Sequence, residues 1–414
     1  MRTEIISTGE ELISGAISDT NASWLASELL EAGLRVSRIT STGDDIKALS
    51  GTFSEVSNRA DLVLVTGGLG PTQDDLTAEA AAAAAEDHFE INPRALVSIE
   101  TYFEKKGWHM NKINTKQAEL PAESRCIINH AGTAPGFYMK INEALFFFMP
   151  GVPFEMKAMF HTSVLPEIKK RVNIEDRILR QTFTLFGMPE AEVGKRLKGF
   201  SRKFPGIRLG FRAAFPLIYV KLACRCKKSA VGREKEKMAM AGTWVESKLG
   251  SRIVSLQGLS MAQEVGRLLS LKNATLGVAE SCTGGLIADM LTDTAGSSQY
   301  FLLSAVTYSN RAKIDILGVN HKTIEVYGAV HQETAREMAE GAKQISGADY
   351  AVSTSGIAGP GGGSAEKPVG TVCIGLAGPG FSRGKHYCFS FTERAMNKKI
   401  FAVTALGLLR RALV

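Results

Sequence analysis

The sequence has few of the features that would set it apart from ordinary globular proteins. Its six cysteines are scattered through 414 residues without a paired framework, which argues against a disulfide-stabilised secreted domain. The longest uninterrupted apolar stretch, near residues 144–149, falls far short of the ~18 residues of a membrane span. The opening residues, Met1-Arg-Thr-Glu-Ile, lack the charged-then-apolar layout of a signal peptide. These absences predict a protein of the reducing cytoplasm that has no membrane partner.

Basic side chains outnumber acidic ones only slightly. The formal net charge is +7, from 49 basic and 42 acidic side chains, which suits anionic ligands but is weak support for nucleic acid as a partner. No repeat of solenoid period is visible. The length predicts two to three domains of roughly 150 residues, and a hydrophobic content of 44% gives each of them enough apolar side chains for a core.

Strands and helices alternate through the first part of the chain. Apolar runs at residues 5–6, 36–39 and 61–65 are typical of buried strands, and the amphipathic segments 21–30 and 46–56 are typical of helices. This order predicts a doubly wound α/β domain with a parallel sheet. Ligands bind such domains at the carboxyl ends of the strands.

A glycine-rich stretch, Thr66-Gly-Gly-Leu-Gly-Pro-Thr72, follows the third of these strands and precedes an alanine-rich helix at residues 78–85. Backbone N–H groups at a helix start can hold a phosphate, and Asp74 and Asp75 are placed to hold a divalent cation against a diphosphate. The alternative is that both aspartates only complement the helix dipole.

The middle of the chain, residues 174–253, has the length of a small domain. Strands are predicted at residues 182–186, 217–223 and 253–254, and helices at 190–197 and 235–249. This sequence of elements predicts a small α+β domain of the split βαβ kind. Its basic residues are best explained as a solvated face.

Ser281 occupies the turn where a predicted strand, residues 276–279, meets a helix that begins after Gly284 and Gly285. A hydroxyl at such a turn is favoured for chemistry because unpaired helix N–H groups can hold an oxyanion. The alternative is that Ser281 and Thr283 are ordinary helix caps.

A serine nucleophile needs a base, and the segment Val306-Thr-Tyr-Ser-Asn-Arg-Ala-Lys313 supplies a phenol and an amine after another predicted strand, residues 305–308. Burial would lower the pKa of Lys313 from its usual value of about 10.4 and make it a base, and Tyr308 could relay the proton or orient the hydroxyl. The alternative is a solvated helix lysine.

The last part of the chain is predicted to be a second α/β domain. Further strands are expected at residues 350–353 and 370–376, with a glycine-rich loop at 353–364 between them. The small residues of that loop let backbone N–H groups approach a ligand, although a flexible linker would have the same composition.

These C-terminal segments resemble the CinA family, whose active members are nicotinamide mononucleotide deamidases that need no cofactor. The resemblance implies Ser281 as nucleophile, with Tyr308 and Lys313 activating it. The family usually has threonine in place of Ser355, and often has arginine in place of Lys398. His331 is interpreted as a helix cap. The candidate substrate-binding residues are Thr283, Gly284, Gly285, Ser355, Gly359, Gly361 and Arg394.

The first ~170 residues resemble the molybdopterin-binding-like domain that begins CinA proteins, on the glycine stretch, Asn114-Thr-Lys-Gln117 and Pro150-Gly-Val-Pro153. The resemblance implies an ADP-ribose pyrophosphatase that releases AMP and ribose 5-phosphate with a divalent metal of the Mg or Co type. The implied phosphate-binding residues are Gly67, Gly68, Gly70 and Thr72, with Lys116 to neutralise charge, and the implied metal ligands are Asp74, Asp75 and Asp45.

The predicted architecture is therefore α/β, with two doubly wound domains at residues 1–172 and 256–414 flanking a small α+β domain at 173–255. The resemblance to the CinA family implies that this middle domain is KH-like and that the protein is a homodimer. The predicted function is pyridine-nucleotide recycling with nicotinamide mononucleotide and ADP-ribose as substrates. Two alternatives stay open: a molybdopterin-like cofactor-binding or adenylyl-transfer module, and a non-enzymatic scaffold for competence or DNA repair.

Overall fold

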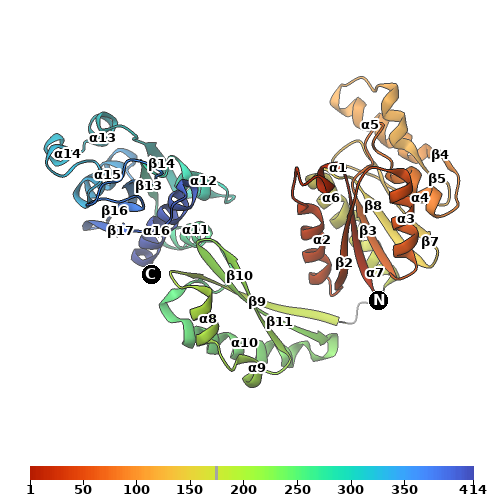
Figure 1. Cartoon of the computed structure of the whole chain (residues 1–414), viewed down its shortest axis with the longest axis horizontal. Helices are drawn as coiled ribbons and strands as arrows, with labels where there is room; N and C mark the ends of the chain where they lie inside the picture. Colours follow the sequence, from red (N-terminus) through yellow and green to blue (C-terminus); the bar gives the residue numbers. More distant parts are fainter. Residues whose placement is uncertain (173–175) are drawn as a thin grey trace. The chain divides into compact units, whose positions relative to one another are not determined.

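The computed structural model describes residues 1–172 and 176–414, which fold as two compact units (Figure 1). One unit is Met1–Ile178 with Arg225–Gly232, and the other is Leu179–Cys224 with Arg233–Val414. The predicted boundary at residues 172/173 adjoins the part outside the described residues. Within 1–172 and 176–414, every helix is too short or too polar to span a bilayer. The predicted mixed α/β class is confirmed.

The first unit is built on a six-stranded sheet in the order β2-β1-β3-β8-β7-β6. Strands β2, β1, β3 and β8 run parallel, and β7 and β6 continue the sheet antiparallel. The strands are β1 (Thr3–Thr8), β2 (Val36–Thr42), β3 (Leu62–Thr66), β6 (Arg125–Ile127), β7 (Gly136–Ile141) and β8 (Ala144–Met149), with a separate pair β4 (Phe89–Ile91) and β5 (Glu119–Pro121).

Helices cover both faces of this sheet, α2 on one side and α3 with α4 on the other (Figure 1). Alternate residues of β3 serve the two cores, with Val63 and Val65 against α3 and Leu64 against α2, as expected of a buried parallel strand. The helices are α1 (Glu10–Ile13), α2 (Thr20–Glu31), α3 (Ile46–Ser57), α4 (Thr77–Ala84), α5 (Pro93–Lys106), α6 (Pro153–Met159) and α7 (Leu165–Arg171), with the short turns η1 (Lys112–Ala118) and η2 (Phe160–Val164).

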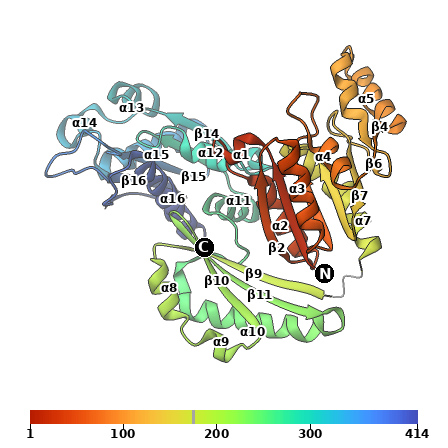
Figure 2. The same cartoon turned by 45° about the vertical axis from the view of Figure 1, so that its right-hand side comes forward.

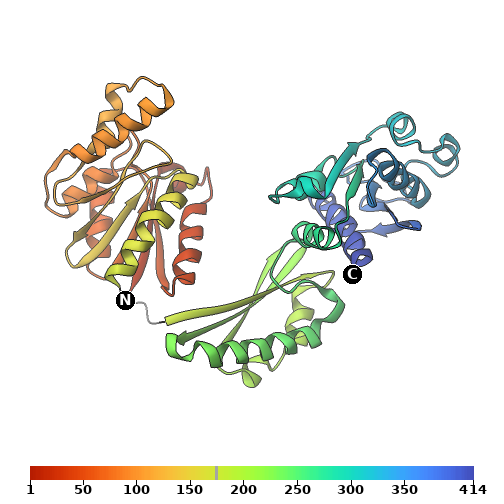
Figure 3. The same ribbon diagram turned by 180° about the vertical axis from the view of Figure 1, so that it is seen from behind.

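The second unit begins with a four-stranded sheet in the order β10-β11-β9-β12, and the long helix α10 lies along one face of it (Figures 2 and 3). Strand β10 was not predicted. It is an edge strand whose residues beyond Ile207 are mostly exposed, so it lacks the alternation that reveals a half-buried strand. The elements are β9 (Asp176–Phe186), α8 (Glu190–Arg196), α9 (Phe200–Lys203), β10 (Ile207–Ala214), β11 (Leu217–Lys227), η3 (Lys228–Ala230), α10 (Val231–Leu249), η4 (Gly250–Arg252) and β12 (Ile253–Ser255).

The remainder of the second unit is a five-stranded sheet in the order β14-β13-β15-β16-β17. The first three strands are parallel, and β16 and β17 are antiparallel. The predicted strand at 305–308 begins and ends earlier, so Thr307 and Tyr308 follow it. The strands are β13 (Leu276–Glu280), β14 (Phe301–Val306), β15 (Tyr350–Gly356), β16 (Thr371–Gly378) and β17 (Phe381–Cys388).

Helices again cover both faces of this sheet. Val278 packs into the core beneath α11, α12 and α16, and its neighbour Ala279 packs into the core beneath α13 and α15. The helices are α11 (Met261–Lys272), α12 (Leu286–Thr292), α13 (Asn310–Leu317), α14 (His321–Tyr327), α15 (Gln332–Ser346) and α16 (Arg394–Leu413), with the turn η5 (Ser297–Gln299). The carboxyl ends of β13, β14 and β15 therefore meet at one edge, where Ser281 lies.

Candidate active site

Ser281 follows β13 directly and is 8% exposed. Its backbone N–H donates to the carbonyl of Thr354 on the neighbouring strand at 3.0 Å, and its own carbonyl accepts from Gly284 at 3.1 Å. The turn after Ser281 depends on Gly284 and Gly285, whose φ angles of 60° and 91° are left-handed and favour residues without a Cβ. The sequence thus fixes the hydroxyl at the strand end, as predicted.

Lys313 lies on α13 and is 1% exposed. The N-cap of that helix, Ser309, accepts from the N–H of Ala312 at 3.1 Å, and the helix turns the amine of Lys313 back toward β13. Its Nζ lies 3.1 Å from Oγ of Ser281 and 2.9 Å from the carbonyl oxygen of Thr307. The structure therefore brings together two residues that are far apart in the sequence.

The surroundings of Lys313 favour its neutral form. Burial lowers the pKa of Lys313 from its ordinary value, and within residues 1–172 and 176–414 no carboxylate forms a salt bridge with it. A neutral amine has two N–H groups and one lone pair. The carbonyls of Thr307 and Tyr308 accept from Nζ at 2.9 and 3.3 Å, which leaves the lone pair for the hydroxyl proton of Ser281. This arrangement is that of a serine with an adjacent general base.

Glu280 is a residue of this site that the sequence reasoning missed. It is fully buried, and its carboxylate accepts from the N–H groups of Gly285, Ile287 and Ala288 at 3.0 to 3.1 Å. The hydroxyl of Ser304 donates to it at 3.4 Å. An acidic side chain at a helix start satisfies orphan N–H groups and complements the dipole. Its position immediately before Ser281, at the end of an apolar strand, was the available signal.

The predicted oxyanion donors are revised by these contacts. The N–H of Gly285 donates to Glu280, and the N–H of Gly284 donates to the carbonyl of Ser281. Of the three residues predicted to supply donors, only Thr283 has a backbone N–H without a hydrogen bond among the described residues. Its hydroxyl pairs with that of Thr354 at 2.7 Å.

Tyr308 contributes differently from the prediction. The residue is 62% exposed, and its phenol oxygen accepts from Arg394 at 3.0 Å. In the described chain the phenol makes no hydrogen bond to Ser281 or Lys313. The same guanidinium donates to the carbonyl of Gly359 at 2.7 Å. Lys398, one turn further along α16, has its Nζ 3.6 Å from the point where a Cβ on Gly284 would lie. Lys398 therefore borders the turn that carries Ser281, while Arg394, on the same helix, borders Tyr308 and the glycine-rich loop.

The loop between α14 and α15 forms another side of the site. Ser355 is 1% exposed and donates to the carbonyl of Ala329 at 2.7 Å, so its hydroxyl fixes this loop. His331 is the N-cap of α15, with Nδ1 accepting from the N–H of Glu333 at 3.2 Å, which confirms its interpretation as a cap. Gly359 and Gly361 lie in the glycine-rich loop, and Gly359 has a left-handed φ of 85°.

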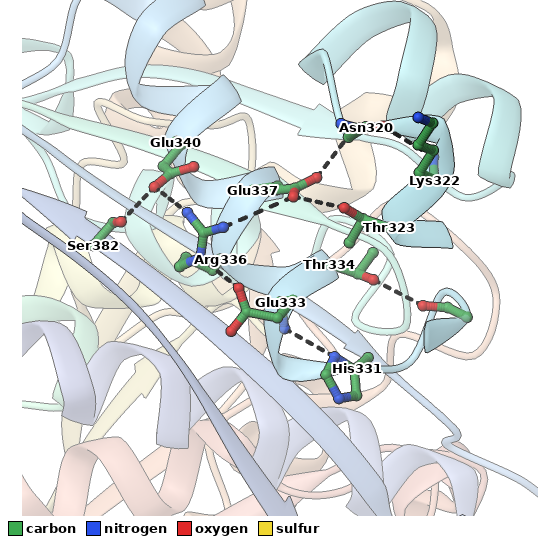
Figure 4. A network of polar contacts seen from close by, with 11 residues as sticks. Asn320, Lys322, Thr323, His331, Glu333, Thr334, Arg336, Glu337, Glu340 and Ser382 are labelled. Carbon is green, nitrogen blue, oxygen red and sulfur yellow. Dashed lines mark hydrogen bonds and ion pairs between the residues drawn. The ribbon is translucent and has the colours of Figure 1, made fainter. Parts of the chain in front are cut away.

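A polar network on α15 holds this loop in place (Figure 4). Arg336 donates to Glu333 at 2.8 Å and to Glu340 at 2.6 Å. Glu337 accepts from the hydroxyl of Thr323 on α14 at 2.7 Å, which ties the two helices together. This network is a structural support, because its carboxylates accept from Arg336 and from residues of neighbouring elements.

A second candidate site lies in the first unit, where β3 meets the predicted glycine stretch. Gly67 and Gly68 have left-handed φ angles of 113° and 63°, and a Cβ on either would overlap Thr8 or Thr77. A Cβ on Gly70 would overlap the carboxylate of Asp75. Gly67 and Gly68 are thus required by their left-handed backbone and by close contact with Thr8 and Thr77, whereas a side chain at Gly70 would have to displace the carboxylate of Asp75.

Oxygen-bearing side chains gather at this loop. Asp75 accepts from the N–H and the hydroxyl of Thr72 at 2.8 and 2.6 Å, Asp74 also accepts from that hydroxyl, and Lys116 donates to the carbonyl of Thr72. The hydrogen bond from Thr72 lowers the pKa of Asp74. Lys116, predicted from a separate segment, thus lies together with Thr72, Asp74 and Asp75.

Asp45, the third implied metal ligand, caps a helix. Its carboxylate is the N-cap of α3 and accepts from Ala48 at 2.9 Å. Asp44, which was not singled out, is the residue near the acidic pair: burial raises its pKa, and Glu11, Asp74 and Asp75 add to the rise. The described residues contain no group of three His, Cys, Asp or Glu side chains arranged for a metal.

The oxygen donors present nevertheless suit one kind of metal. Mg²⁺ is usually held by one or two carboxylates together with waters and substrate phosphates. Two aspartates and a hydroxyl beside a glycine loop fit this requirement, and Asp74 and Asp75 would hold the cation.

The fold and the sites define an α/β protein with a buried serine–lysine pair at the edge of one sheet and a glycine loop with acidic residues at the edge of another. Residues 258–413 match the CinA C-terminal domain, and residues 4–170 match the probable molybdopterin binding domain. The chain belongs to the CinA family.

Relatives match over the whole length. A CinA-like protein of Desulforapulum autotrophicum is 53% identical over 420 residues, covering 100% of this chain and 99% of the relative. A CinA-like protein of Desulfosudis oleivorans is 48% identical over 419 residues, covering 100% of both. The crystal structure of the competence/damage inducible protein CihA from Agrobacterium tumefaciens is 41% identical, covers 37% of this chain and 96% of that chain, and has a TM-score of 0.36.

Proposed function

We propose that the site around Ser281 hydrolyses the carboxamide of nicotinamide mononucleotide, giving nicotinate mononucleotide and ammonia. The observation that carries the proposal is the 3.1 Å contact between Nζ of Lys313 and Oγ of Ser281, with the amine 1% exposed. Arg394 and Lys398 support a substrate with a phosphate, because cations one helical turn apart can share it.

The reaction follows from the positions of these groups. Oγ of Ser281 attacks the carboxamide carbon while its proton moves to Nζ of Lys313. The protonated amine then returns this proton to the leaving nitrogen, so that ammonia departs and an ester on Ser281 remains. Water then attacks the ester while Lys313 accepts a proton from it. Lys313 returns this proton to Oγ of Ser281 as the bond between Oγ and the acyl carbon breaks, which regenerates the serine and the neutral amine and releases the acid product, which ionises to the carboxylate.

The proposed activity is tested by incubating the full chain with nicotinamide mononucleotide and resolving the products by chromatography. We expect nicotinate mononucleotide and ammonia in equal amounts. The absence of both, at every pH tested, would contradict the proposal.

The rate of deamidation is expected to depend on pH. Lys313 acts as a base only when it is neutral, and burial lowers its pKa, so kcat/KM rises with pH through that lowered pKa and levels off above it. The midpoint of this rise in kcat/KM should therefore lie below the usual lysine pKa of about 10.4. A pH profile of ammonia release measures it, and Tyr308→Phe is the control: it should keep this rise, because the phenol contacts Arg394 instead of Lys313. If kcat/KM did not change with pH, or if Tyr308→Phe abolished the rise of kcat/KM with pH, Lys313 would not be the general base.

For the first unit we propose metal-dependent hydrolysis of the diphosphate of ADP-ribose. The proximity of Thr72, Asp74, Asp75 and Lys116 supports it. Mg²⁺ or a similar cation would spread the negative charge of the phosphates, while the ammonium of Lys116 would sit beside the same loop. This assignment also fits recycling of pyridine nucleotides.

Replacing Asp74 and Asp75 together by asparagine should lower AMP release from ADP-ribose at least ~100-fold, since the metal supplies several kcal/mol. Titration calorimetry with Mg²⁺ should show the loss of binding directly. Asp45→Asn is the matched control: it removes one carboxylate charge but keeps an amide oxygen that can cap α3, and it should keep both metal binding and AMP release. If Asp45→Asn lowered AMP release as much as the double variant, or if the double variant released AMP at the unchanged rate, the assignment would be contradicted.

A further inference from the structure

A cavity of about 710 Å³ lies within the second unit, away from Ser281. Its walls include Phe186, Phe215, Phe389 and Phe391. The cavity is partly open to solvent, and ligand pockets of this kind measure about 300 to 1,000 Å³. The volume is therefore that of a small-molecule site.

The cavity belongs to a defined interface. Helix α16 lines it with Ile400, Thr404, Gly407 and Arg411, which share one helix face. Arg410 donates to the carbonyls of Val254 and Ile253 at 2.8 and 2.9 Å, which joins α16 to β12.

A ring contact between Phe215 and Phe391, with centroids 4.9 Å apart, closes the other side. Leu217 and Val254 belong to the same hydrophobic core as α16, so the walls are parts of one packed body.

The charged groups of the cavity are mostly cationic. Arg252, Arg410 and Arg411 line it together with a single carboxylate, Glu190. Across residues 1–172 and 176–414, neither Arg252 nor Arg411 has a carboxylate partner. Burial lowers the pKa of Arg410, and the charges of Arg411 and Arg267 add to this. Guanidinium groups beside aromatic walls suit a ligand that is apolar at one end and anionic at the other.

We propose that this cavity binds a small amphipathic anion, with an aromatic or acyl body between the phenylalanines and one carboxylate, sulfonate or phosphate at Arg252 and Arg411. This site is distinct from the Ser281 site, because none of Ser281, Lys313 or Arg394 lines the cavity.

The fluorescent probe 8-anilinonaphthalene-1-sulfonate tests the proposal on the full chain. We expect one probe molecule to bind per chain with enhanced emission, and dodecanoate to displace it at concentrations where dodecanol does not. Ala213 lines the cavity and is exposed on β10, so Ala213→Trp should obstruct the cavity without disturbing the core and weaken probe binding at least ~10-fold, about 1.4 kcal/mol.

Ala214→Trp is the matched control, because Ala214 is the next exposed residue of β10 and does not line the cavity. It should bind the probe like the unchanged chain, and both tryptophan variants should keep their melting temperature and nicotinamide mononucleotide turnover. Arg252→Gln with Arg411→Gln should weaken probe binding about 3- to 10-fold, as expected of exposed charges. Unchanged affinity in Ala213→Trp, or equal displacement by dodecanol, would overturn the proposal, whatever the outcome at Ser281.

Discussion

Replacing Lys313 by methionine is expected to lower the rate of nicotinamide mononucleotide deamidation by about 10² to 10⁴-fold, the usual contribution of a positioned general base. The amine is the only side-chain nitrogen within hydrogen-bond distance of Oγ of Ser281 in the described chain. Methionine is similar in length and apolar, so it fits a site that is 1% exposed. We therefore expect kcat to fall while the melting temperature stays the same or rises.

The control for this change is Lys322→Met on α14, an exposed lysine whose side chain has no hydrogen bond among the described residues. It should leave the rate of ammonia release unchanged. A Lys313→Met variant with undiminished turnover would remove the base from the mechanism.

The second large effect is expected at Arg394. Its guanidinium donates to Tyr308 and Gly359 at 3.0 and 2.7 Å, one helical turn before Lys398 on α16, and we place the substrate phosphate at these two cations. A hydrogen bond to a charged group contributes about 1.5 to 3 kcal/mol, so Arg394→Ala should raise KM about 10- to 150-fold. We expect kcat to change far less, because the contact with a phosphate remote from the reacting carbon stabilises the bound substrate and the transition state equally.

The phosphate itself provides the control substrate. Nicotinamide riboside lacks it, so Arg394→Ala should leave the KM for the riboside almost unchanged. Arg311→Ala, which removes an exposed guanidinium paired with Asp315 at 3.0 Å, should leave both KM values unchanged. If Arg394→Ala raised the KM for the mononucleotide and for the riboside by the same factor, Arg394 would only support the loop around Gly359.

Much of the fold could be predicted, because buried parallel strands are short apolar runs and helices show their caps. The strands around Leu64 and Val278 and the helix that begins after Asp45 are examples. The exposed edge strand that ends at Ala214 was not predicted, because its side chains do not alternate between buried and exposed positions. The length of the strand before Thr307 was misjudged because its exposed residues include apolar ones such as Leu302 and Val306.

The serine and lysine of the site could also be predicted, since both follow strands that run in the same direction. Pairing of Glu280 with Val306 places the next residues, Ser281 and Thr307, side by side. The role of Glu280 could not be read in this way. Its three N–H donors reach it only because Gly284 and Gly285 take left-handed φ angles, and these follow from the folded turn.

The position of the Tyr308 side chain could not be predicted from the sequence either. Its backbone carbonyl contacts Lys313, and its phenol turns outward to Arg394. A residue two positions beyond a strand end can direct backbone and side chain to different partners, and spacing alone does not separate them.

The most direct test of the account compares the unchanged chain with Ser281→Ala under the same conditions. Oγ of Ser281 is the atom that forms the ester, so its removal leaves the amine of Lys313 without a nucleophile to deprotonate. With nicotinamide mononucleotide as the only substrate, we expect the unchanged chain to release ammonia and nicotinate mononucleotide in equal amounts, and Ser281→Ala to release neither above background. Equal turnover by both proteins would contradict the central claim that this serine and lysine carry out the reaction.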